Sequence, residues 1–146
     1  MPETIFINTD GGSRGNPGPA AIGIVFFDIE GIEIHSHKEY IGEGTNNTAE
    51  YRAIEKALQI LVKSKWFVDN NSDGNRVVCR LDSLLVVEQI NGRYKIKQPH
   101  IAGYVGEIKE LIAQCNLNIT FVHIPREQNK VADKLVNEAL DQELKR

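Results

Sequence analysis

Apolar and polar residues follow a strand-like pattern in the first third of the chain. Short β-rich runs at 4–9 and 20–27 predict two buried strands, which a turn rich in glycine and proline separates. Residues 32–41 alternate between apolar side chains, among them Ile34, and charged or histidine side chains. This alternation predicts an antiparallel strand with one face in solvent, so the three segments form one antiparallel unit.

Helical spacing replaces this alternation near residue 50. Asn47 is predicted to cap the first helix, with Glu50 three residues on in the capping-box position. A polar loop over 69–76 and a short strand over 77–81 follow. The apolar stripe of the helix comprises Ile54, Ala57, Leu58, Leu61 and Val62.

Predicted helices and strands then alternate to the end of the chain. A short helix is expected over 83–91, and Pro99 is placed to open a longer one. A last strand over 118–124 precedes a final helix that Asn129 is predicted to cap. The order β-β-β-α-β-α-α-β-α predicts an α/β fold. In it, a mixed five-stranded sheet is flanked by helices, and right-handed crossovers add the later strands in parallel.

Composition and charge exclude several classes of protein. The 146 residues carry a net charge of −3, which argues against nucleic-acid binding through overall positive charge but not against a local basic strip. No apolar run approaches the roughly 20 residues of a membrane span, and the acidic first ten residues argue against a secretory signal. The two cysteines, Cys79 and Cys115, do not suit a disulfide scaffold or zinc ribbon and predict a reducing, cytoplasmic location.

Four acidic residues lie where the predicted elements would bring them together. Asp10 follows the first strand and Asp82 the fourth, so as parallel neighbours these strands would place both carboxylates at one sheet edge. Glu50 starts the buried stripe of its helix, and Asp133 lies in the first turns of the last helix, beside its apolar face. Taken singly, each acid also fits a turn, a capping box or a helix dipole.

The joint placement of these acids indicates metal chemistry. Converging carboxylates repel one another strongly unless cations hold them. Clusters that offer only oxygen ligands select Mg²⁺ or Mn²⁺ over zinc. Two such ions about 4 Å apart are a known device for phosphodiester cleavage, so the residues predict a site of this kind.

The segments around the acids resemble the type 1 ribonuclease H family, which cleaves the RNA strand of RNA–DNA hybrids. The resemblance covers nearly the whole chain and implies a single ribonuclease H domain over 1–146, with sheet order 3-2-1-4-5 and strand 2 antiparallel. It rests on four blocks, namely TDGGSRGNPGPAAIG at 9–23, GTNNTAEYRA at 44–53, LDS at 81–83 followed by VVEQING, and HIPREQNKVADKLVN at 123–137.

The resemblance also implies a mechanism. Asp10, Glu50, Asp82 and Asp133 take the catalytic and metal-binding positions, with two Mg²⁺ or Mn²⁺ ions per site when substrate is bound. Activated water would cut the RNA strand internally and leave 5′-phosphate and 3′-hydroxyl ends.

Small neutral residues near the acids are expected to contact the hybrid. Glycines let a nucleic-acid backbone approach closely, and short amides and hydroxyls reach its minor groove, its 2′-hydroxyls and a phosphate. Turn and cap roles explain the same residues, and for Asn47 the two interpretations stand level. The expected contacts are Gly11, Gly12, Asn16, Thr45, Asn46 and Asn47.

Two departures from the family pattern concern substrate grip. Only residues 92–98 separate two helices where many bacterial relatives carry a basic protrusion. Arg93, Lys95 and Lys97 are candidates to grip the hybrid instead, with an ordinary solvated charge run as the other interpretation. Leu84 stands where many relatives place a polar groove contact.

A third departure concerns the short loop before Asp133, where many relatives carry a mobile histidine. Counting without gaps assigns that place to His123, whereas a shortened loop assigns it to Arg126. Arginine cannot act as a base, but it can clamp the scissile phosphate. The sequence favours Arg126 as a substrate contact and leaves His123 open.

Other functions compete with the nuclease. A degenerate site would make the chain a hybrid or double-stranded RNA binding module, although all four acids are present. An actin-like nucleotide phosphohydrolase needs a second lobe, and the chain has no G-x-x-x-x-G-K-[ST] loop. We therefore predict a stand-alone, monomeric nuclease whose partner is an RNA–DNA hybrid, with the choice between Mg²⁺ and Mn²⁺ open.

Overall fold

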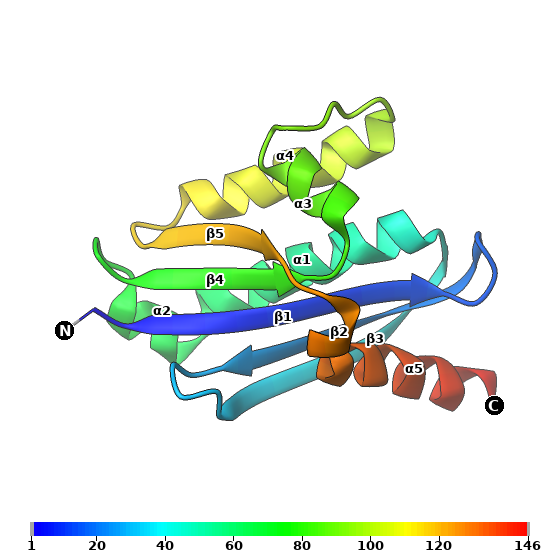
Figure 1. The fold of residues 1–146 in the computed structure, drawn as a ribbon, viewed down its shortest axis with the longest axis horizontal. Helices are drawn as coiled ribbons and strands as arrows, with labels where there is room; N and C mark the ends of the chain where they lie inside the picture. Colours follow the sequence, from blue (N-terminus) through cyan, green and yellow to red (C-terminus); the bar gives the residue numbers. More distant parts are fainter. Residues whose placement is uncertain (1, 146) are drawn as a thin grey trace.

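Five strands form one mixed sheet in the computed structural model, which describes residues 2–145 (Figure 1). The sheet order is β3-β2-β1-β4-β5; β2 pairs antiparallel with both β1 and β3, and β4 pairs parallel with both β1 and β5. This arrangement confirms the predicted α/β class and strand order. The strands are β1 (Thr4–Ser13), β2 (Gly18–Phe27), β3 (Glu33–Gly44), β4 (Arg76–Leu81) and β5 (Asn118–His123).

Helices cover both faces of this sheet. The helices are α1 (Asn46–Lys63), α2 (Lys65–Asn70), α3 (Leu84–Ile90), α4 (Pro99–Ala113) and α5 (Lys130–Leu144), with a 3₁₀ turn, η1 (Arg126–Gln128), before α5. α1 and α4 lie together on one face, and α5 packs against β2 and β3 on the other (Figure 1). Across residues 2–145 no helix combines the length and apolar character that a membrane crossing requires.

The two faces of the sheet carry apolar clusters of very different size. The large cluster fills the space between the sheet and α1, α3 and α4, and includes the fully buried Ile7 and Ile54. The small cluster joins Ala21 of β2 to Val136 and Leu140 of α5. Because burying a large aliphatic side chain contributes about 1.5–3 kcal/mol, most of the packing energy lies on the α1 face.

Thr45, and not Asn47, caps α1. The Thr45 backbone is extended, and its Oγ1 accepts a hydrogen bond from Thr48 N at 3.1 Å. The prediction for Asn47 is wrong because Thr45 offers its hydroxyl two residues earlier, in the backbone conformation that an N-cap requires. Glu50 therefore lies outside the capping-box position, which leaves its burial without a capping explanation.

Three further segments differ from their predicted form. Residues 65–70 form a helix that reaches into the loop predicted over 69–76. The Ser64 hydroxyl caps this helix by accepting from Phe67 N at 3.1 Å. β1 runs past residue 9 to Ser13, since the residues after Asp10 still pair with β2. Ile34, predicted on the apolar face of its strand, is 49% exposed on β3, which is an edge strand of the sheet.

Cys79 and Cys115 are both free thiols. Cys79 is fully buried in β4, and burial raises the pKa of its thiol to about 12. The thiol therefore stays protonated and serves as a small apolar side chain of the core.

Candidate active site

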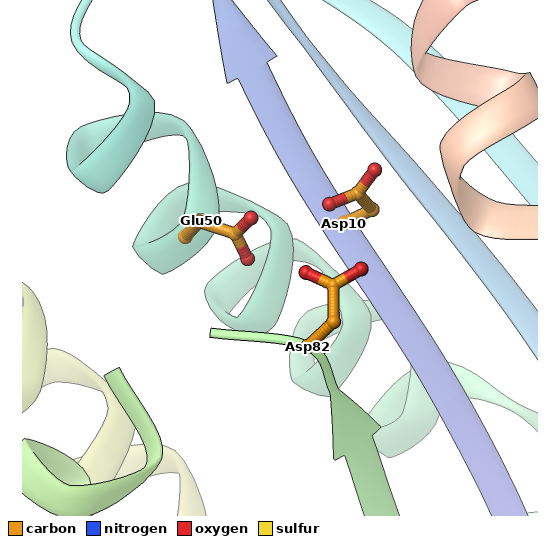
Figure 2. Close-up of side chains that lie close together, drawn as sticks. All are labelled: Asp10, Glu50 and Asp82. Carbon is orange, nitrogen blue, oxygen red and sulfur yellow. The ribbon is translucent and has the colours of Figure 1, made fainter. Parts of the chain in front are cut away.

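Three carboxylates meet where β1 and β4 stop pairing. The parallel register of the two strands ends at Asn8 and Arg80, and each strand presents an acid two residues further on, Asp10 and Asp82. Glu50 reaches the same place from the first turns of α1 (Figure 2). One oxygen from each carboxylate lies within 4.8 Å of the others. The structure thus brings together three of the four acids that the sequence singled out.

Two glycines let the helices approach the sheet closely enough to deliver their acids. A Cβ on Gly11 of β1 would lie 2.3 Å from the backbone carbonyl of Ala49 in α1. A Cβ on Gly23 of β2 would lie 2.3 Å from the carbonyl oxygen of Ala132 in α5. In each helix the contacted residue directly precedes a predicted acid. Glycine at these two positions therefore allows helices on opposite faces to bring carboxylates to one end of the sheet.

Asp10 and Glu50, here called the inner pair, are 8% and 7% exposed. Burial, with the charge of Asp82, raises the pKa of Asp10 from 3.8 to about 7. Burial, with the charge of Asp10, also raises the pKa of Glu50 well above its ordinary value.

The inner pair fits a divalent cation. Within residues 2–145, Glu50 Oε2 is buried without a hydrogen-bond partner, and no lysine, arginine or histidine forms an ion pair with Asp10, Glu50 or Asp82. Bare carboxylates in this setting are unfavourable. A hard cation that takes oxygen ligands would relieve both the repulsion and the missing hydrogen bond.

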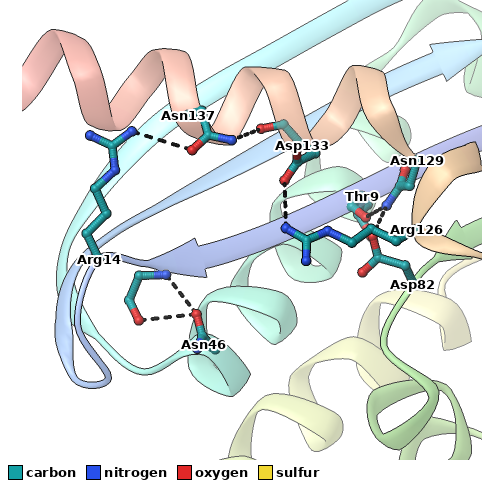
Figure 3. Close-up of polar contacts among 9 residues, drawn as sticks. Thr9, Arg14, Asn46, Asp82, Arg126, Asn129, Asp133 and Asn137 are labelled. Carbon is teal, nitrogen blue, oxygen red and sulfur yellow. Dashed lines mark hydrogen bonds and ion pairs between the residues drawn. The ribbon is translucent and has the colours of Figure 1, made fainter.

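Asp82 and Asp133, here called the outer pair, are half-buried and have other partners. Asp82 Oδ2 accepts from Asn129 Nδ2 at 3.3 Å, and Asp133 Oδ1 lies 4.0 Å from Arg126 Nη2 (Figure 3). Asp133 lines the same pocket as the other acids but lies outside the 4.8 Å group. Neighbouring side chains therefore orient the outer pair, which solvent reaches.

Asn129 is a site residue whose role sequence reasoning missed. It occupies the predicted cap position of α5, but its side chain makes no cap hydrogen bond. Instead it is fully buried, and Nδ2 donates to Thr9 O at 2.9 Å as well as to Asp82. The amide ties the start of α5 to β1 and orients Asp82. Since asparagine is common at helix caps, its position in the sequence gave no signal of this second role.

A pocket of about 470 Å³ opens over the four acids, and the turn after β1 forms one of its walls. Asn46 at the start of α1 fixes this turn. Its Oδ1 accepts from Ser13 N at 2.9 Å (Figure 3). Its backbone N–H donates to Asn16 Oδ1 at 3.0 Å. Thr45 is occupied as the α1 cap. Of the expected hybrid contacts, those that line the pocket are Gly11, Gly12, Asn46 and Arg126.

Asn47 faces a second groove, of about 310 Å³, on the other side of the α1 start. Lys95 and Lys97 line this groove as well. Arg93, expected beside these lysines, instead pairs with Glu88 of α3, with Nε 2.6 Å from Oε2. The start of α1 thus separates an acidic pocket from a groove with two lysines.

The structure separates the two candidates for the loop before α5. His123 is the last residue of β5, is exposed, and does not line the acidic pocket. Arg126 follows in η1, is 82% exposed and lines that pocket. Leu84, the first residue of α3, is 48% exposed.

Known proteins are similar to this chain over most of its length. A family model described as reverse transcriptase-like matches residues 8–139. Ribonuclease HI of Halobacterium salinarum is 37% identical over 132 residues, covering 90% of this chain and 62% of that protein. Bifunctional protein Rv2228c of Mycobacterium tuberculosis is 37% identical over 138 residues, covering 94% of this chain and 35% of that protein. The chain thus spans about a third of the length of this mycobacterial relative.

Solved structures share both sequence and fold with the chain. LC11-RNase H1, solved in complex with an RNA/DNA hybrid, is 47% identical with a TM-score of 0.88, covering 96% of this chain and 99% of that one. RNase H1 from Halobacterium salinarum NRC-1 is 35% identical with a TM-score of 0.83, covering 95% and 98%. The likeness therefore extends over nearly all of the sheet and helices described above.

Proposed function

The chain belongs to the type 1 ribonuclease H family, and from that premise we propose that it is an endonuclease that hydrolyses the RNA strand of RNA–DNA hybrids. The observation that carries the proposal is the convergence of Asp10, Glu50 and Asp82, with Asp133 in the same pocket. The relative LC11-RNase H1 was solved with an RNA/DNA hybrid, which supports the substrate class.

The donor set fits Mg²⁺ or Mn²⁺, and we expect two ions per site in the substrate complex, held by the four acids. Bound ions of this kind activate water and steady the leaving oxygen of a phosphodiester, which leaves 5′-phosphate and 3′-hydroxyl ends. The inner pair supplies two carboxylates that are buried from solvent. The outer pair completes the ligand set from the side that substrate reaches.

The two grooves suit the two strands of a hybrid. In this proposal the RNA strand lies in the acidic pocket, where Gly12 at the end of β1 meets its sugars and Arg126 clamps the scissile phosphate; Asn16 meets the same strand from the turn beside the pocket. The start of α1, with Asn46, lies in the minor groove between the two strands. The other strand then lies beside Lys95, whose ammonium contacts its phosphates.

The remaining expectations extend this proposal. We expect the chain to act as a monomer and as one domain over 1–146. The free thiols of Cys79 and Cys115 support a reducing, cytoplasmic location.

A cleavage assay tests the proposal. An end-labelled RNA–DNA hybrid is incubated with the protein and Mg²⁺ or Mn²⁺, beside single-stranded RNA and duplex RNA of the same sequence. We expect internal cuts in the RNA of the hybrid, which EDTA and Asp10→Asn abolish. Asp73→Asn, in the exposed loop before β4, removes one carboxylate at the far end of that strand and should leave cleavage intact.

A different pattern would reassign the function. Retention of the hybrid in a shift assay without cleavage by either metal would indicate a degenerate binding module. Equal cleavage of all three RNAs would indicate a nuclease that does not recognise the hybrid.

A further inference from the structure

Arg14 lies at one end of the acidic pocket, and no role given above uses it. It belongs to the turn after β1 and lines the pocket. Its Nη2 lies 2.7 Å from Asp141 Oδ1 and donates to Asn137 Oδ1 at 3.4 Å, both residues of α5. Figure 3 shows Arg14 and Arg126 on opposite sides of Asp133, so the pocket has a guanidinium at each end.

The ion pair between Arg14 and Asp141 is a weak structural link. The two side chains are 40% and 52% exposed, and pairs this open contribute little to stability. Asp141 also lies in the last turn of α5, where a negative charge opposes the helix dipole and the turn itself contains no basic residue. A stronger anion can therefore replace Asp141 at little expense to the fold.

The backbone around Arg14 is held in place. Arg14 N donates to Pro19 O at 2.8 Å across the turn. A Cβ on Gly18 would lie 2.1 Å from Arg14 O, so the turn closes as tightly as a glycine permits. A change of partner at this position therefore involves the side chain of Arg14 and not its backbone.

The spacing along α5 indicates which anion Arg14 would meet. Asp133, Asn137 and Asp141 follow one another at intervals of four residues, so they form one row on α5. At 1.5 Å per residue, Asp141 lies about 12 Å along the axis from Asp133. Paired with Asp141, Arg14 is thus placed to meet a phosphate further along the strand than the one that meets the acids.

We propose that Arg14 binds a backbone phosphate of the strand in the acidic pocket, away from the scissile position, and that Asp141 holds the guanidinium until that phosphate replaces it. A guanidinium can form two parallel hydrogen bonds with a phosphate. Its exposed ion pair with Asp141 contributes little by comparison. The identity of the strand as the RNA of a hybrid rests on the proposed function.

Salt-dependent binding tests this inference without cleavage. The Asp10→Asn protein, which leaves the hybrid uncut, is titrated with an RNA–DNA hybrid between 50 and 200 mM NaCl. Adding Arg14→Gln should raise Kd about 5- to 10-fold at low salt and lower the slope of log K against log salt by about 1, as for loss of one phosphate contact. Arg14→Lys should recover the slope and part of the affinity.

Two matched variants separate phosphate binding from a structural role. Asp141→Asn removes the competing carboxylate and should leave binding unchanged or tighten it. Lys65→Gln removes a cation that pairs with Asp69 at 2.8 Å on α2, at the far end of the molecule, and should change neither Kd nor slope (Figure 1). If Arg14→Gln and Asp141→Asn instead weaken binding and lower the melting temperature alike, with the slope unchanged, Arg14 only links the turn to α5 and the inference fails.

The outcomes also distinguish this inference from the proposed function. A protein that binds the hybrid with the expected slopes but cuts no RNA refutes the nuclease and leaves the Arg14 contact standing. A protein that cuts the hybrid while Arg14→Gln and Arg14→Lys keep the parent slope refutes only the contact. A protein that neither retains nor cuts the hybrid refutes both.

Discussion

The inner and outer pairs of acids share one pocket but are held there in different ways. Asp10 and Glu50 are buried against the α1 face, where burial raises the pKa of both carboxyls. Asp82 and Asp133 are half-buried and contact Asn129 and Arg126. The inner pair is therefore unfavourable until a cation binds it, whereas each acid of the outer pair lies beside a polar or charged neighbour. From this difference we propose that the inner pair captures the cation and that the outer pair aligns the substrate.

Substituting one acid from each pair is the most severe test of this comparison. Asp10→Asn should lower kcat on the order of 10³-fold or more, because an amide cannot supply the buried charge that a divalent ion needs. Asp133→Asn should lower kcat about 10- to 100-fold, because water can replace a solvent-exposed ligand. Steady-state cleavage of the hybrid at saturating Mg²⁺ measures both. Equal losses from the two substitutions would remove the distinction between the pairs.

The packing of α1 offers a second way to break the inner pair without touching a carboxylate. Gly11→Ala would place a Cβ 2.3 Å from the Ala49 backbone, so α1 must shift and carry Glu50 away from Asp10. We expect kcat to fall about 100-fold and the free energy of unfolding to fall by about 1–3 kcal/mol.

Gly12→Ala is the matched control for this substitution. Its Cβ would meet Val136 Cγ1 at 3.7 Å, an ordinary contact, so the free energy of unfolding should stay within about 0.5 kcal/mol of the parent. Urea denaturation of both variants, with kinetics of Gly11→Ala, provides the comparison, because Gly12 is itself an expected substrate contact. A Gly11→Ala protein with unchanged kcat would show that the inner pair tolerates movement of α1.

The sequence predicted the sheet well because its signals were local and mutually consistent. Alternation and short apolar runs marked the strands, and the acids after two parallel neighbours, Asp10 and Asp82, had to emerge at one edge. The apolar stripe of α1 likewise placed Glu50 on a buried face. The elements follow from chain order and periodicity, whereas the neighbouring placement of the two strands came from the family resemblance; together they predicted the convergence of these acids.

The sequence could not show which of several equivalent polar side chains makes a given hydrogen bond with the backbone. Thr45 and Asn47 are both good caps, and only the observed extended backbone at Thr45 decides between them. Asn129 occupies a cap position while its side chain points elsewhere, toward Thr9 and Asp82. The sequence did not reveal the packing role of Gly11 either, because a role in the following turn already accounts for a glycine at this position. Tertiary contacts, not local propensity, settle these cases.

Asn129 allows the outer pair to be tested by way of its support. Asn129→Ala removes the hydrogen bonds to Thr9 O and Asp82 Oδ2, so Asp82 loses its orientation and a buried carbonyl loses its donor. We expect kcat to fall about 10-fold, with a loss of about 1–3 kcal/mol in the free energy of unfolding. Asn137→Ala, which removes an exposed amide from the same helix, is the control for the free energy of unfolding. If Asn129→Ala lowers stability and leaves kcat unchanged, the amide only anchors α5.

The last prediction concerns stability alone, and it isolates the inner pair from catalysis. Asp10 titrates near pH 7 when folded and near 3.8 when unfolded, so the folded protein binds more protons between these values. The contribution of Asp10 to the free energy of unfolding of the metal-free protein should therefore fall as pH rises from about 4 to about 7 and then level off. Asp10→Asn removes this titration. It should stabilise the metal-free protein at pH 8 on the order of 2–4 kcal/mol, or roughly 5–10 °C in melting temperature.

Mg²⁺ sharpens the same measurement because it acts on the charge that Asp10→Asn removes. At pH 8, millimolar Mg²⁺ should raise the melting temperature of the parent protein by a few degrees, since it binds the folded state and relieves the repulsion within the inner pair. The same addition should move the melting temperature of Asp10→Asn little, and that of Asp133→Asn nearly as much as the parent's, because that variant retains the inner pair. Melting curves at pH 5 and pH 8, with EDTA or Mg²⁺, give all of these values. A parent protein that is most stable at pH 8 in EDTA would mean that the buried carboxylates are compensated within the fold, and cation capture could then no longer be assigned to them.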